Sequence, residues 1–254
     1  FLRHLSGSLA IIGKISGAHC TVSEPVAKGK PHKVYKVNEI FETIQGEGSY
    51  TGTPAIFLRL QGCPVGCSWC DTKQTWDIDP ELQLSPAAIL EKKADSDHWC
   101  SLSSAEVVQL FADKGYRAKH VVITGGEPCM YDLRPLCELL HAQGFSTQIE
   151  TSGTFEILAP GNTWVTVSPK VNMKGGYQVL RTALERANEI KHPVAMEKHI
   201  EELLELLQGL DLTNKLVYLQ PISQKAKATQ LAIEFCKQYN WRLSVQVHKY
   251  LGIN

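Results

Sequence analysis

Residues 63–72 read CPVGCSWCDT, a stretch that sets three cysteines, Cys63, Cys67 and Cys70, in the spacing C-x3-C-x2-C. Three thiolates in this spacing can each bind one iron of a cubane cluster, which leaves the fourth iron open to another ligand. Clusters that only carry electrons normally use four cysteines, and a structural zinc normally fills four tetrahedral positions. The stretch therefore predicts an enzyme. A zinc loop whose fourth ligand comes from elsewhere in the chain is the alternative.

Size and charge narrow the class of protein. The chain has 254 residues with 26 Lys and Arg against 26 Asp and Glu, and its length suits one α/β domain. It has no basic run that could form a phosphate-binding stripe, so a small molecule is expected as the partner and nucleic acid is not. No apolar stretch approaches the ~18 residues that a membrane span needs, so no membrane association is expected. The remaining cysteines occur singly, which indicates reduced thiols in the cytoplasm.

The chain divides at about residue 33. Residues 1–33 are rich in Ser, Gly and Lys and lack sustained periodicity, which predicts a leader, a tag or an unstructured extension. Residues 34–254 are expected to form the folded domain.

Within that domain, apolar segments alternate with helical patterns. The expected strands are 55–60, 121–123, 147–150, 164–167, 189–191, 216–219 and 242–247. The expected helices begin at Ser85-Pro86 and at the capping box Ser103-x-x-Glu106, and continue near 133–143, 177–186, 197–207 and 231–239. This order predicts a parallel sheet covered by crossover helices, either a full or partial barrel or an open doubly wound sheet. Polar motifs after most strands favour the barrel, which collects its active site at that end.

Four motifs follow strands: GGEP at 125–128, ETSG at 150–153, SPK at 168–170 and QPIS at 220–223. Each alone is typical of an ordinary turn. Glycines at 125 and 126 would let main-chain carbonyls approach a ligand ammonium group. A bare iron beside such a strand end suits an amino acid that chelates through its amino and carboxylate groups, and S-adenosylmethionine is one.

The cysteine motif and GGEP together resemble the radical S-adenosylmethionine superfamily. A narrower resemblance, to the 7-carboxy-7-deazaguanine synthase family, covers nearly all of 34–254. It is carried by NEIFETIQGEG at 38–48, GTPAIFLR at 52–59, GCPVGCSWCDT at 62–72, QPIS at 220–223 and QVHKY at 246–250. The resemblance implies an α/β fold, a partial (β/α) barrel of the radical S-adenosylmethionine type.

The family's activity would be a lyase reaction in queuosine biosynthesis. It implies that 6-carboxy-5,6,7,8-tetrahydropterin becomes 7-carboxy-7-deazaguanine with loss of ammonia. The implied cofactors are a [4Fe-4S] cluster, S-adenosylmethionine and Mg²⁺, and these would carry the chemistry, so no side chain is expected to be catalytic in its own right. The implied partners are an electron donor such as a flavodoxin or ferredoxin and a second copy of the chain in a homodimer.

The resemblance also assigns residues. Cys63, Cys67 and Cys70 would hold the cluster, and Thr72 would bind Mg²⁺, although Asp71 is the more usual kind of ligand. The residues expected around S-adenosylmethionine are Trp69, Cys70, Asp71, Gly126, Glu127, Glu150, Ser152, Ser168, Pro169, Lys170, Gln220, Pro221, Ile222 and Ser223. Those expected at the pterin are Ile44, Gln45, Gly46, Arg59, Thr124, His248 and Asn254. Without the resemblance, Arg59 equally suits a strand-end salt bridge, and His248 suits a structural role.

Two other classes of function remain open. A glycyl-radical activating enzyme would share the cluster but act on a protein, and a zinc-stabilised binding module would catalyse nothing. Gln45, Arg59 and Thr72 resemble a small-molecule site, and the chain has no further cysteine cluster, which weighs against the activating enzyme.

Overall fold

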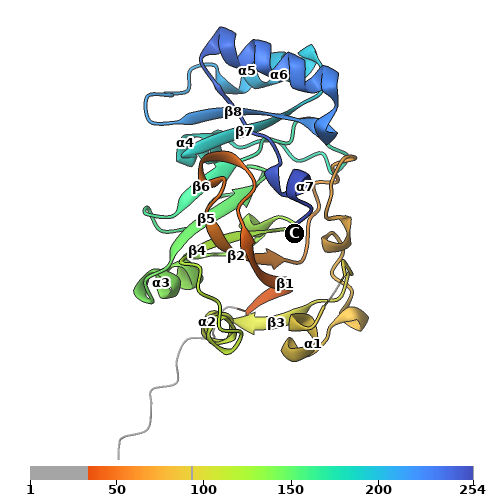
Figure 1. Ribbon diagram of the computed structural model, residues 1–254, viewed down its shortest axis with the longest axis vertical. Helices are drawn as coiled ribbons and strands as arrows, with labels where there is room; N and C mark the ends of the chain where they lie inside the picture. The colour runs from red at the N-terminus through yellow and green to blue at the C-terminus, as the bar shows by residue number, and fades with distance from the viewer. Residues whose placement is uncertain (1–33, 93, 254) are drawn as a thin grey trace, which may run out of the picture. The chain divides into compact units, whose positions relative to one another are not determined.

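The computed structural model describes residues 34–92 and 94–253 (Figure 1). The expectation for 1–33 and the expected pterin contact Asn254 lie outside the described residues. Within them, nine strands form one sheet in the order β3-β1-β2-β4-β5-β6-β7-β8-β9. The strands are β1 (Val34–Ile44), β2 (Pro54–Leu60), β3 (Cys100–Ser103), β4 (His120–Gly125), β5 (Ser146–Thr151), β6 (Trp164–Val167), β7 (Glu189–Val194), β8 (Leu216–Pro221) and β9 (Arg242–Leu243).

The sheet has two parts. From β2 through β9 every neighbouring pair is parallel, whereas β1 is antiparallel to both β2 and β3. The outermost strands, β3 and β9, pair with β1 and β8 and not with each other, so the barrel is partial, as expected.

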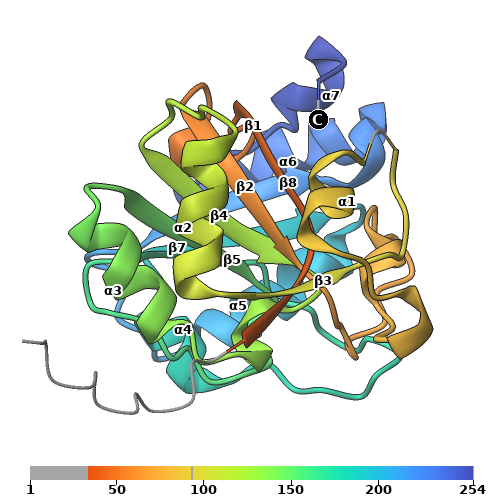
Figure 2. The ribbon, with the colours of Figure 1, turned by 90° about the horizontal axis from the view of Figure 1, so that it is seen from below.

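Helices cover the outer face of the sheet. They are α1 (Pro86–Leu90), α2 (Ser104–Asp113), α3 (Arg134–Ala142), α4 (Arg181–Arg186), α5 (Glu197–Leu207) and α6 (Ala226–Tyr239), with a short α7 (Val247–Leu251) at the end. In Figure 2, α2 and α3 lie side by side outside the sheet, while α5 and α6 contact β7 and β8. Val121, Val122 and Ile123 of β4 are fully buried, which fits a strand covered on both faces. In the part of the chain that the structure describes, no helix combines the length and apolarity needed to cross a membrane.

Two predicted helix starts are confirmed. The Ser85 hydroxyl accepts a hydrogen bond from the Ala88 amide and caps α1. At α2, the Ser103 hydroxyl accepts from the Glu106 amide while a Glu106 carboxylate oxygen accepts from the Ser103 amide at 2.7 Å, which completes the capping box.

The predicted last strand over 242–247 begins at Arg242 as expected, but its predicted end at Val247 is wrong. β9 ends at Leu243, and Val247 begins α7. After Ser244, whose amide still donates to the Leu219 carbonyl, the chain leaves the sheet, and the Val247 amide donates to the Gly46 carbonyl at 2.9 Å. Contacts with a distant loop therefore override the apolar pattern of this segment. Helix α4 also begins later than expected, at Arg181.

The sequence patterns do not predict β1 as a strand, and β1 contains a β-bulge. Val37 pairs with Leu60 and Glu39 pairs with Arg59, so Asn38 is an extra residue on β1. Val37 is buried in the core before the bulge, and Ile40 is buried in the same core after it. The side-chain alternation along β1 is therefore shifted by one residue at Asn38.

Candidate active site

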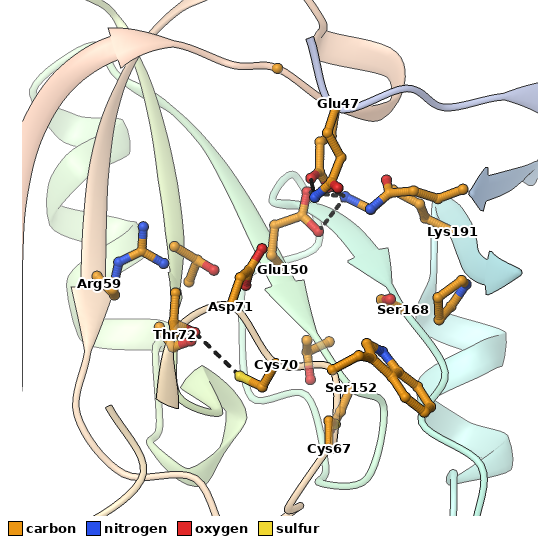
Figure 3. A pocket seen from close by; sticks show the side chains of 18 of the residues that line it. Glu47, Arg59, Cys67, Cys70, Asp71, Thr72, Glu150, Ser152, Ser168 and Lys191 are labelled. Carbon is orange, nitrogen blue, oxygen red and sulfur yellow. Dashed lines mark hydrogen bonds and ion pairs between the residues drawn. The ribbon is translucent and has the colours of Figure 1, made fainter. Parts of the chain in front are cut away.

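A cavity of about 320 Å³ lies where the parallel strands end (Figure 3). Every expected site residue that the structure describes lines it, except Pro169, which is buried in the loop after β6. Several lining residues are absent from the expected set: Phe41, Glu47, Phe57, Val65, Gly125, Thr151, Lys191, Pro193, Gln246 and Lys249. The cavity therefore combines the strand-end motifs with side chains that motif reading does not find.

The three thiols of the cysteine loop open into this cavity. Among the described residues, no three His, Cys, Asp or Glu side chains converge closely enough to hold a single metal ion. A single zinc needs converging ligands, whereas a cubane takes one thiolate at each of three separate irons. The donor set thus fits a cluster. Burial raises the pKa of Cys63 to about 11, so metal binding would displace a proton there.

Two polar groups lie beside the sulfur of Cys70. The indole nitrogen of Trp76 donates to it at 3.4 Å, and the Thr72 hydroxyl lies 3.6 Å away. The same hydroxyl lies 3.4 Å from the Gly125 carbonyl. Hydrogen bonds to a ligating sulfur are one of the means by which a protein tunes a cluster's potential.

The glycines after β4 are required by neighbouring main chain. A Cβ atom on Gly126 would lie 2.1 Å from the Gly62 carbonyl oxygen, and one on Gly125 would lie 2.3 Å from the Leu60 amide nitrogen. Gly125 also has a positive φ of 139°. The cysteine loop and the end of β4 therefore pack backbone to backbone, a reason for these glycines that differs from the expected approach to a ligand.

Glu127 joins two strand ends. One of its carboxylate oxygens accepts from the Cys129 amide at 2.9 Å and the Thr151 hydroxyl at 2.6 Å, and the other accepts from both the amide and the hydroxyl of Ser152. The residue is 1% exposed. Because both oxygens already have two protein donors, Glu127 fixes Ser152 in place at the end of β5.

Three charged residues form another wall of the cavity: Lys191 is buried, and Glu47 and Glu150 are mostly buried, with side chains 16% and 15% exposed. The Lys191 ammonium lies 2.7 Å from a Glu47 oxygen and 2.9 Å from a Glu150 oxygen (Figure 3). Burial raises the pKa of Glu150 to about 7, with Glu47 and Glu189 adding to the rise and Lys191 opposing it. For Glu47, burial is outweighed by Lys191, and its pKa falls to about 2. The sequence does hold a signal for these three charged residues, because Lys191 lies on a strand that is predicted to be buried. A buried lysine needs an acidic side chain beside it.

The C-terminal helix closes one side of the cavity. The Gln246 amide donates to Glu47 at 2.8 Å, and the Lys249 ammonium lies 3.6 Å from an Asp71 oxygen in the cysteine loop. A Cβ on Gly46 would lie 2.4 Å from the His248 ring, so this ring packs directly on the Gln45–Gly46 main chain. Burial lowers the pKa of His248, which favours the neutral imidazole.

Arg59 lies across the cavity from Ser168 and Lys191 (Figure 3). Its Nε donates to a Glu39 oxygen, so the salt bridge considered from the sequence is present while the side chain also lines the cavity. Its guanidinium lies 5.8 Å from the Phe41 ring centre, and Phe41 stacks on Phe57 at 5.3 Å.

Comparison with known proteins agrees with this geometry. Residues 44–173 match the family model described as "4Fe-4S single cluster domain". The chain is 59% identical over 220 residues to the 7-carboxy-7-deazaguanine synthase of Escherichia coli strain K12. The aligned region covers 86% of this chain and 99% of that protein. It is 33% identical to the 7-carboxy-7-deazaguanine synthase of Synechocystis, with 86% and 93% covered.

A solved structure gives the same result. The crystal structure of QueE from Escherichia coli superposes with a TM-score of 0.83 at 58% identity, covering 85% of this chain and 95% of that one. The match covers 85% of this chain, well beyond the cysteine loop. This chain belongs to the 7-carboxy-7-deazaguanine synthase family.

Proposed function

We propose that the chain is a 7-carboxy-7-deazaguanine synthase, a radical S-adenosylmethionine lyase that converts 6-carboxy-5,6,7,8-tetrahydropterin to 7-carboxy-7-deazaguanine with loss of ammonia. The observation that carries this proposal is that one cavity joins the three-cysteine loop to Arg59 and to the Gln45–Gly46 main chain, in a chain 59% identical to a protein of that name. The zinc-stabilised module and the activating enzyme are not favoured.

Each side of the cavity has a proposed role. Cys63, Cys67 and Cys70 would hold the cluster, which together with S-adenosylmethionine supplies the one-electron chemistry that starts the ring contraction. The residues proposed to bind S-adenosylmethionine are Trp69, Asp71, Gly126, Glu150, Ser152, Ser168, Lys170, Gln220, Pro221, Ile222 and Ser223. Lys170 is partly buried and donates to the Ser168 carbonyl at 3.0 Å, so each residue constrains the position of the other.

On the substrate side, the Gln45–Gly46 main chain and the His248 ring would meet the pterin edge, since amide groups match its donors and acceptors. Arg59 would pair with the substrate carboxylate through its planar fork of donors. Ile44 and Thr124 complete the proposed contacts, and Thr72 would bind Mg²⁺ through its hydroxyl, a neutral ligand that suits an ion retaining water.

We also propose a homodimer, an electron donor of the flavodoxin or ferredoxin type, and a place in the cytoplasm. The described cysteines are all free thiols, which suits a reducing compartment.

Product formation tests the function directly. Reconstituted, reduced protein supplied with S-adenosylmethionine, Mg²⁺ and the carboxytetrahydropterin is expected to yield the carboxydeazaguanine, followed by liquid chromatography and mass spectrometry. Cys67→Ala is expected to lose the cluster absorbance near 400 nm and all product. The matched control is Cys236→Ala, a buried thiol on α6 outside the cavity, which is expected to keep both. Product from Cys67→Ala would refute the cluster assignment, and a colourless wild-type protein with one zinc would refute the proposal.

A further inference from the structure

The β-bulge at Asn38 determines which side chains of β1 face the cavity. Before it, Val37 is in the core; after it, Ile40 is in the core and Phe41 lines the cavity. An unbroken strand would alternate without the shift and would place Ile40 opposite to Val37. The bulge therefore brings Glu39 onto the cavity face, directly opposite Arg59 on β2.

A polar network holds the bulge in place. The Asn38 side-chain amide is fully buried and donates to Gln61 at 2.8 Å and to the Ser96 carbonyl at 2.9 Å. The Lys92 ammonium donates to both the carbonyl and the side-chain oxygen of Asn38 at 3.0 Å. Because these donors and acceptors satisfy one another, the extra residue has one fixed conformation.

Glu39 accepts a hydrogen bond from one particular nitrogen of Arg59, Nε. Its carboxylate accepts from Nε, and the two side chains are only 20% and 17% exposed. The terminal nitrogens of Arg59 make no hydrogen bond to any other residue in 34–92 or 94–253 that the structure records. The guanidinium also lies near the Phe41 ring, which limits its rotation. The Nε side of the planar Arg59 guanidinium is thus fixed by Glu39. Its two terminal nitrogens, which can bind a carboxylate, have no recorded hydrogen bond to another described residue.

We propose that Glu39 is a positioning residue: it holds the Arg59 guanidinium so that its two terminal nitrogens present themselves to the carboxylate of the ligand. This rests on the proposed function, because it takes a carboxylated pterin as the substrate. The role depends on the reach of the Glu39 side chain to Nε. Its negative charge alone would weaken carboxylate binding at Arg59.

Two variants of Glu39 separate the effect of its side-chain length from the effect of its negative charge. Glu39→Gln keeps an acceptor at the same distance and removes the charge, whereas Glu39→Asp keeps the charge and withdraws it by one methylene. The measurement uses reconstituted holoenzyme with S-adenosylmethionine and Mg²⁺. Dissociation constants of 6-carboxypterin and of pterin, which lacks the carboxylate, are measured by the fluorescence of the pterin ring. Their ratio reports carboxylate recognition without turnover.

In the wild type the ratio is expected to favour 6-carboxypterin by about 30-fold or more, the scale of a charge-assisted bidentate contact. Glu39→Asp is expected to reduce this ratio about fivefold to tenfold, with pterin affinity unchanged, and Glu39→Gln to stay within about threefold of the wild type. Glu42→Gln is the matched control on the exposed side of β1, where Glu42 accepts from the Arg117 and Ala118 amides, and the ratio is expected to stay unchanged.

The opposite order, tighter carboxylate binding in Glu39→Gln and an unchanged ratio in Glu39→Asp, would overturn the positioning role and leave the proposed function standing. A wild-type ratio near one would instead overturn the proposed substrate itself, and with it the role of Glu39. Cluster absorbance of each variant confirms that the proteins compared are folded and loaded.

Discussion

The parallel strands and the antiparallel edge supply the cavity in different ways. β4 to β8 contribute residues at or just after their carboxyl ends, such as Gly126 and Ser168, together with Lys191 on β7. β1 and β2 contribute side chains from the middle of the strands, Phe41 and Phe57 among them. Strand ends show up in the sequence as motifs, whereas a mid-strand residue faces the cavity only because of pairing register. On the antiparallel side, the site therefore depends on the pairing register of β1 and β2. On the parallel side, it depends on close contacts between main-chain segments and on buried charged side chains.

The largest expected effect is on the parallel side. Lys191→Met leaves the mostly buried Glu47 and Glu150 without their shared cation, and we expect the free energy of unfolding to fall by about 3–4 kcal/mol. Denaturant unfolding of the apoprotein measures it. Lys198→Met is the control, because that side chain is 67% exposed, and it should change stability by no more than about 0.5 kcal/mol. A loss below about 1 kcal/mol for Lys191→Met would contradict the buried network.

Close backbone approach gives the second effect. Gly126→Ala drives a methyl group against the Gly62 carbonyl, so we expect a loss of about 3 kcal/mol and a displaced cysteine loop that reconstitutes poorly. Gly161→Ala is the matched control, since nothing lies within 4 Å of its Cβ position. Thermal unfolding and iron content measure both changes. Equal behaviour of the two variants would show that the loop adapts to a side chain at 126.

The third effect depends on pH. The pKa of Glu150 rises from an ordinary 4.5 to about 7 on folding, so the unfolded chain ionises first as pH rises. The contribution of Glu150 to stability is therefore complete below pH 4.5 and is lost as pH rises through 7, by about 2–3 kcal/mol relative to Glu150→Gln. Urea unfolding of the two apoproteins at pH 4.5, 6 and 8 gives the difference. A constant difference across this range would show that folding leaves the pKa of Glu150 unchanged.

The smallest effect tests the antiparallel edge. Ser103→Ala removes the cap of α2 at the end of β3, and we expect a loss of about 1 kcal/mol with the carboxylate selectivity of the cavity unchanged. Ser101→Ala on the same strand is the control, since its hydroxyl accepts only a 3.3 Å bond from the exposed Gln83 side chain. Thermal unfolding resolves the pair, and a cap variant as stable as its control would contradict the capping box.

Much of the fold follows from local patterns. β4 and β8 have apolar centres and precede glycine or polar turns, and the α2 capping box is explicit in Ser103 and Glu106. β1 escapes prediction because Asn38 breaks its alternation, and the segment after Leu243 is assigned wrongly because its hydrogen bonds go to Gly46, about 200 positions away in sequence. Local preference cannot encode contacts of that separation.

The site shows the same limit. Cysteine spacing and strand-end motifs find the cluster loop, and the family resemblance assigns most of the other lining residues; nearly all of the assigned residues meet in one cavity. Glu47, Gln246 and Lys249 are missed because their roles arise from partners on other elements. Pro169 is included only as part of a contiguous motif, and it does not reach the cavity. A motif identifies a segment, but the fold decides which of its side chains face the ligand.

The bulge at Asn38 works like a frameshift that is confined to one strand. One additional residue changes which face every later side chain of β1 presents, while the pairing with β2 continues. Deleting Asn38 would leave Glu39 opposite Arg59, whereas pairing β1 without a bulge while Asn38 is kept would place Asn38 there and replace a carboxylate by an amide without any substitution. In relatives, a gap in the alignment at this position would therefore keep the acid opposite the arginine, whereas the same extra residue without its bulge would not.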